Sequence, residues 1–150
     1  MKHRVRTLAA VLLIGSCVSC VGPARTTSTY QGKAGHTAQA ALSQLQTALL
    51  AVKTSNRGNM LHAYLLVALS QAEDNFSSIQ ATFDSIQPPQ SEVADQVRDK
   101  LDKILSDGSD GLAQLRIAAR RNDTATVTAT AKDLTQTADQ LSAFSEDPTP

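Results

Sequence analysis

Two cysteines near the start of the chain, Cys17 and Cys20, are its only thiols. Their C-x-x-C spacing occurs in thiol redox sites and in metal sites. A redox pair, however, needs a helix N-terminus inside a folded domain to lower its thiol pKa. Cys17 and Cys20 instead follow the apolar run Leu8 to Ile14. We therefore expect neither a redox pair nor a metal site at these cysteines.

The residues before Cys17 have the order of a secretory signal peptide. Positive charge comes first, and the short apolar run Leu8 to Ile14 follows it. The uncharged stretch from Thr7 to Val21 covers about 15 residues, which is fewer than the roughly 20 that a membrane-spanning helix needs. The pattern therefore favours a signal peptide over residues 1–16 rather than a permanent transmembrane helix.

The segment that ends at Cys17 reads Leu13-Ile14-Gly15-Ser16-Cys17. It resembles the lipobox of bacterial lipoproteins. The resemblance implies that the thiol of Cys17 is acylated, that the chain is cut before this residue, and that the acyl chains hold the protein on a membrane. Cys20 is a competing acceptor, but Cys17 would then occupy the place three residues earlier, where an aliphatic residue is expected.

We found no other pattern of catalytic or cofactor-binding residues. Neither His36 nor His62 has the Glu three residues earlier that a di-iron bundle requires. The sequence also lacks a nucleophile elbow and a glycine-rich phosphate loop. We therefore predict that the protein is not an enzyme and holds no cofactor or metal.

Charge and composition narrow the choice of partners and of fold. Basic and acidic residues number 14 each, and removal of Lys2, Arg4 and Arg6 with the leader leaves a net charge of about −3. Such a charge argues against a nucleic-acid-binding protein. Five aromatic residues and no Trp imply a core of Leu, Ile, Val and Ala, which suits close packing of helices.

After Cys17, the chain divides into a predicted tether, four amphipathic segments and a tail. Residues 17–34 are rich in Thr, Ser and Gly without an apolar period, which predicts a disordered tether. Apolar residues then recur at steps of three and four, which is typical of helices packed on one face. On this spacing, the buried face of the first segment is expected to include Leu42, Leu45 and Leu49, and that of the second to include Leu61 and Leu65. The helices are expected at residues 35–55, 59–86 and 91–121, and from Asp123 or Thr124 through Leu141, with residues 146–150 as a disordered tail.

Short turns between these segments predict an all-α, up-down-up-down four-helix bundle over residues 35–145. Gly58 and Pro88-Pro89 mark two of the turns. The segment from Ser106 to Gly111 admits two interpretations, a loop or a continuous helix in which Gly108 and Gly111 let a neighbour come close. The apolar register continues from Leu101 to Leu115, which favours one helix.

Arg116, Arg120 and Arg121 close the third segment. Cations suit the negative end of a helix, so these residues are expected there on structural grounds alone. They are also the candidate interaction patch, for an acidic partner or an anionic lipid.

These features together predict a membrane-anchored, extracytoplasmic lipoprotein of the cell envelope. Its helical domain vaguely resembles small envelope lipoproteins of unknown function. We expect a non-catalytic module for protein interaction or envelope assembly. The alternatives are a carrier of apolar small ligands or lipids in the bundle core and, for location, secretion without an anchor.

The lipobox gives a direct prediction. Mass spectrometry of the mature protein should find an N-terminus at Cys17 that carries acyl chains, because acylation and cleavage at a lipobox occur at the same residue. An unmodified N-terminus produced by cleavage near Ala24 would contradict it and indicate a freely secreted protein.

Overall fold

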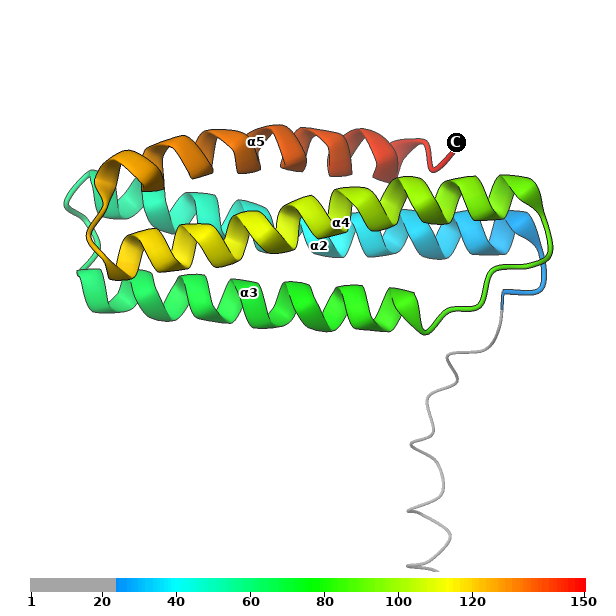
Figure 1. Ribbon diagram of the computed structural model, residues 1–150, viewed down its shortest axis with the longest axis horizontal. Helices are drawn as coiled ribbons and strands as arrows, with labels where there is room; N and C mark the ends of the chain where they lie inside the picture. The colour runs from blue at the N-terminus through cyan, green and yellow to red at the C-terminus, as the bar shows by residue number, and fades with distance from the viewer. Residues whose placement is uncertain (1–23) are drawn as a thin grey trace, which may run out of the picture.

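The computed structural model describes residues 24–150, and Figure 1 shows them as a bundle of four long helices without a strand in that range. Each helix runs antiparallel to the one before it, as predicted. The helices are α2 (Thr27–Asn56), α3 (His62–Asp84), α4 (Glu92–Arg120) and α5 (Thr124–Glu146).

The predicted signal peptide and the lipidation site Cys17 lie outside the described residues. Of the predicted tether, only its last part is described, and there the prediction is wrong, because α2 begins at Thr27. The hydroxyl of Thr26 accepts a hydrogen bond from the Thr29 amide at 3.2 Å and caps the helix. Tyr30 and Ala34, one turn apart, are fully buried. A single buried face therefore makes this polar segment helical.

The predicted disordered tail lies against the bundle instead of extending away from it. Glu146 is the last residue of α5. The ammonium group of Lys100 donates a hydrogen bond to the Thr149 carbonyl at 2.9 Å. Pro148 packs over Gly35, where a Cβ atom would lie 3.6 Å from its ring. The tail thus covers one end of the α2–α5 contact.

Small residues form the buried face of α2. Alanines at 34, 38, 41 and 48 are buried together with Leu45, whereas Leu42 and Leu49, which the sequence pattern placed on this face, are only partly buried. The buried positions follow steps of four and three, so the spacing was correctly predicted and the centre of the face was not.

Alanines at these positions allow close approach of the helices. α2 packs against its neighbours α3 and α5 and also against α4, the helix diagonally opposite, whereas α3 and α5, both fully described, do not contact each other. Larger side chains in the centre of α2 would hold α4 away. The bundle is therefore compressed along the α2–α4 diagonal.

α4 is continuous through Gly108 and Gly111, as the sequence favoured. Each glycine faces a large side chain of a neighbouring helix. A Cβ on Gly108 would lie 2.6 Å from the ring of Phe76 on α3, and a Cβ on Gly111 would lie 2.6 Å from a methyl group of Leu134 on α5. The glycines are thus notches in α4 that receive these two side chains.

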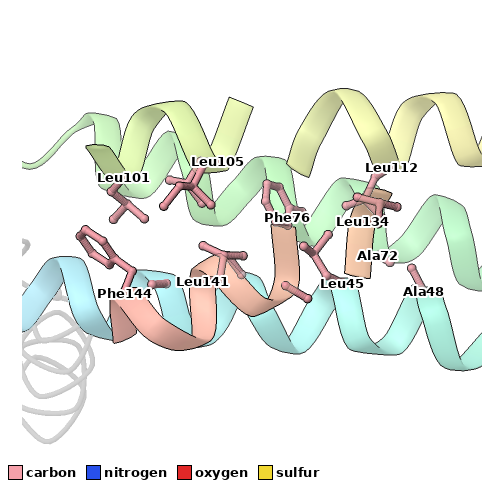
Figure 2. Packing of buried hydrophobic residues seen from close by; sticks show 14 of the residues in the cluster. Leu45, Ala48, Ala72, Phe76, Leu101, Leu105, Leu112, Leu134, Leu141 and Phe144 are labelled. Carbon is pink, nitrogen blue, oxygen red and sulfur yellow. The ribbon is translucent and has the colours of Figure 1, made fainter. Parts of the chain in front are cut away.

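The core between the helices is filled by aliphatic and aromatic side chains. In Figure 2, labelled residues from α2, α3, α4 and α5 point toward the common axis. Phe76 and Phe83 have no exposed surface, and burial of each ring is worth about 1.5–3 kcal/mol. The domain therefore obtains its stability from packing.

The α2–α3 and α4–α5 turns share one backbone geometry. At the end of α2, the Gly58 amide donates to the Ser55 carbonyl and the Asn59 amide donates to the Thr54 carbonyl. At the end of α4, the Asn122 and Asp123 amides donate in the same way to the carbonyls of Ala119 and Ala118. Gly58 and Asn122 have positive φ values of 73° and 55°. Both turns are Schellman motifs, which satisfy the last carbonyls of each helix.

The glycine notch predicts opposite effects for two alanine substitutions. Gly108→Ala should lower the free energy of unfolding by about 1–2 kcal/mol, because overpacking against the rigid Phe76 ring outweighs the gain in helix propensity. Gly32→Ala is the control, since Gly32 lies inside α2 with nothing within 4 Å of the added Cβ. It should raise the free energy of unfolding by about 0.5–1 kcal/mol.

Urea denaturation followed by circular dichroism measures both effects. In a Phe76→Leu background, Gly108→Ala should lower the free energy of unfolding by less than it does in the original chain, because the smaller side chain leaves room for the methyl group. If Gly108→Ala is as stabilising as Gly32→Ala, the notch has no role in packing.

Candidate functional site

The two ends of the bundle differ in what they expose. The α2–α3 turn and the α4–α5 turn lie together at one end, which we call the tip. The described chain starts and ends at the opposite end, which we call the entry end (Figure 1). The tip therefore lies the full length of α2 away from the point where the N-terminal residues join the bundle. For a helix of 30 residues this is about 45 Å.

The tip exposes three apolar side chains from the start of α3. Leu61 is 70% exposed, Tyr64 66% and Val67 63%. Residues three apart are neighbours on a helix surface, so the three side chains form one ridge. The sequence pattern assigned Leu61 to the buried face. That assignment is wrong, because Leu61 is the N-cap residue of α3 and its side chain lies in solvent, whereas Leu65, one turn further along, is buried.

The three predicted arginines do not act as one patch. Arg116 forms a two-point ion pair with Glu73 of α3, through Nε and through Nη2, which lies 3.1 Å from Oε1. The two side chains are only 25% and 20% exposed. The hydrogen bond with Glu73 raises the pKa of Arg116 further above its ordinary value. Arg116 thus joins α3 to α4.

Arg120 and Arg121 remain exposed at the α4–α5 turn, and Arg57 is exposed in the α2–α3 turn at the same end. Arg120 also lines a surface groove of about 540 Å³ between α3 and α4, whose other lining residues include Leu66, Val67 and Asp74. Asp123, in the α4–α5 turn, caps α5 by accepting a hydrogen bond from the Thr126 amide at 3.0 Å. The tip therefore combines an apolar ridge with a mainly basic border, a surface suited to contact with a partner.

The entry end contains a cluster of polar side chains around Arg98 of α4. Its guanidinium donates to the carbonyls of Asp84 and Ile86 at 3.2 and 3.1 Å, at the C-terminal end of α3. α3 has no basic residue in its own last turn. Arg98 thus supplies the positive charge that this helix end favours.

Two buried polar atoms beside Arg98 lack a hydrogen bond, the Tyr30 hydroxyl and Asp102 Oδ1. The other carboxylate oxygen, Oδ2, lies 3.4 Å from Arg98 Nε. Burial raises the pKa of Asp102 more than the charge of Arg98 lowers it. Burial likewise raises the pKa of Tyr30. Each of these two atoms is buried without a hydrogen-bond partner, which lowers the stability of the folded state.

A second groove, of about 670 Å³, lies on the surface between α4 and α5 near the entry end. Ile104, Ala143 and Phe144 contribute apolar surface to it, and Lys100 lies over the Phe144 ring with its Nζ 5.8 Å from the ring centre. The negative charges of Asp107 and Asp147 balance the positive charges of Lys100 and Lys103 at its border. The groove has no net charge to select a ligand.

Among residues 24–150, no three His, Cys, Asp or Glu side chains are close enough to hold a metal ion. His36 and His62 are exposed on different helices. Within the same described range, no helix is long and apolar enough to cross a membrane. Comparison with known protein families, curated proteins and solved structures finds no match.

Sequence reasoning found Arg120 and Arg121 but missed the apolar ridge beside them. One signal was present. Tyr64 and Val67 are three residues apart and do not belong to the buried face of α3, so an apolar pair outside that face could have been identified. Arg57 lies four residues before Leu61, so the α2–α3 turn itself brings it near the ridge. Its place beside Arg120 and Arg121 depends on the parallel packing of α2 and α4, whose C-terminal ends meet at the tip, and had no signal in the local sequence.

The partly buried carboxylate of Asp102 predicts a pH effect on stability. The pKa of Asp102 is raised in the folded protein. The folded state therefore binds this proton more tightly than the unfolded state, and its contribution is present at acid pH and lost as pH rises through the raised pKa. Asp102→Asn should remove this component of the pH dependence, which is a fall in stability as pH rises above the ordinary Asp pKa of about 4.

Urea unfolding of the protein and of Asp102→Asn at pH values below and above this pKa measures the difference, with Asp139→Asn, at an exposed position of α5, as the control. Identical pH profiles for the protein and Asp102→Asn would show that burial of Asp102 has no effect on its proton affinity.

Proposed function

We propose that this protein is a membrane-anchored, non-catalytic contact module of the cell envelope, held by a lipidated Cys17 and acting through the tip of its bundle. The observation that carries the proposal is the exposed ridge of Leu61, Tyr64 and Val67 at the end farthest from the N-terminal segment. Exposed apolar surface of this kind on an otherwise well-packed domain is typical of interaction sites.

The rigidity of the bundle supports this role. The filled core, the Arg116–Glu73 pair and the two Schellman turns fix the tip relative to the entry end. A contact surface on such a scaffold needs no ordering when it binds, which lowers the cost of association.

The carrier alternative, in which the bundle core holds a lipid or another apolar ligand, has less support. The positions that a core ligand would occupy are filled by fully buried side chains such as Phe76, Phe83 and Leu105. The two largest grooves described above lie on the surface between helices. A ligand in the core would have to separate helices that alanine and glycine bring into close contact.

Site-specific photo-crosslinking in intact cells tests the proposal. A photoreactive residue in place of Tyr64 should give a discrete adduct with an envelope component, whereas the same residue in place of Asp139, exposed on α5 away from the tip, should not. Cys17→Ser should move the protein out of the membrane fraction and weaken the adduct, because the anchor raises the local concentration.

Adducts of equal yield from positions 64 and 139 would show that the tip has no special role. A Cys17→Ser variant that stays in the membrane fraction with unchanged adducts would refute the anchor.

A further inference from the structure

We infer that the tip binds an anionic lipid bilayer, with Leu61, Tyr64 and Val67 entering the headgroup region and the tip arginines contacting lipid phosphates. This inference rests on the proposed function in that it uses the same contact surface, and it names what that surface contacts.

The first argument is the size of the apolar ridge. Three side chains exposed by about two thirds present on the order of a few hundred Å². A stable protein interface needs roughly 800 Å² from each partner. A bilayer needs no complementary shape, and a few apolar side chains are enough for insertion when basic residues assist them.

The second argument is the sequence at the start of α3. Leu61 occupies the N-cap position, where no side chain hydrogen-bonds to the first amides of the helix. Leu is among the least favourable residues at this position, and Ser, Thr, Asp or Asn would be more stable. An exposed Leu that leaves the first amides of α3 without a side-chain cap is costly in water. Both features become favourable when the side chain enters lipid and the amides meet phosphates.

The charge of the tip also favours an anionic bilayer. Arg57, Arg120 and Arg121 are exposed in the two turns at the tip. Asp123, the exposed cap of α5, keeps its negative charge and offsets one of these three positive charges, so the tip stays net positive. Asp74 lies further along the α3–α4 groove, more than two helical turns beyond Tyr64. The border of the ridge thus attracts anionic headgroups, each arginine contributing about a fivefold increase in partitioning.

The chain has no Trp, so a single introduced Trp reports its own surroundings. We would use the full chain with Cys17→Ser and Cys20→Ser, and place the probe by Tyr64→Trp or, as the control away from the tip, by Asp139→Trp. Asp139 is exposed on α5, 15 residues or about 22 Å from the tip end of that helix, so both probes start in contact with water. Both chains keep the N-terminal apolar segment, so binding through that segment alone would affect both probes in the same way.

With phosphatidylglycerol vesicles, the emission of the Tyr64→Trp probe should shift to shorter wavelength and resist quenching by acrylamide, while the Asp139→Trp probe should not change. Pure phosphatidylcholine vesicles should give a much smaller response. The pair Arg120→Gln and Arg121→Gln should weaken the tip response to vesicles about 30-fold. The matched pair Lys132→Gln and Lys103→Gln, at exposed positions of α5 and α4, should leave it within a few-fold.

An unchanged Tyr64→Trp probe, or equal responses of the two probes, would overturn the lipid inference. Crosslinking at position 64 separates this result from failure of the proposed function. A discrete protein adduct together with a silent Trp probe would refute the lipid contact and leave the contact module standing. A silent probe without any adduct would refute both.

Discussion

The close packing of α2 against α4 is the constraint on which the rest of the structure depends. In a bundle with equally large residues on every helix, diagonal helices are held apart by their own side chains. Here alanines occupy most of the centre of α2, and α4 approaches it across the bundle. Because α4 lies close to α2, the large side chains of α3 and α5 need space on α4 itself. Gly108 and Gly111 provide that space for Phe76 and Leu134.

This arrangement explains why the protein retains glycines in the middle of a long helix. Each interior glycine costs about 1 kcal/mol in helix propensity relative to alanine. Burial of a complete aromatic ring is worth more than that, so the helix is less stable in isolation and the bundle is more stable as a whole.

The backbone carbonyls at the helix ends are satisfied in different ways at the two ends of the bundle. At the entry end, Arg98 is directed toward the C-terminal carbonyls of α3, and the Tyr30 hydroxyl and one carboxylate oxygen of Asp102 are buried beside it. At the tip, the carbonyls of α2 and α4 are satisfied within their own turns by the Schellman geometry. No side chain from another helix is needed there for that purpose, so Leu61, Tyr64 and the arginines of the tip remain exposed and able to contact a partner.

The sequence by itself determined the fold class, the four helical segments and the continuity of α4, because apolar spacing of three and four, proline and glycine at turns, and capping residues are local properties of the chain. It also located Arg120 and Arg121 at a helix end. The lipobox at Cys17 is likewise a local pattern, and it stays a prediction. Only the tertiary structure decided which face of α2 is central, because the choice between Ala41 and Leu42 depends on how near α4 lies. The same holds for the start of α2 at Thr27, which depends on burial of Tyr30 against other helices, and for the exposure of Leu61 at the N-cap of α3.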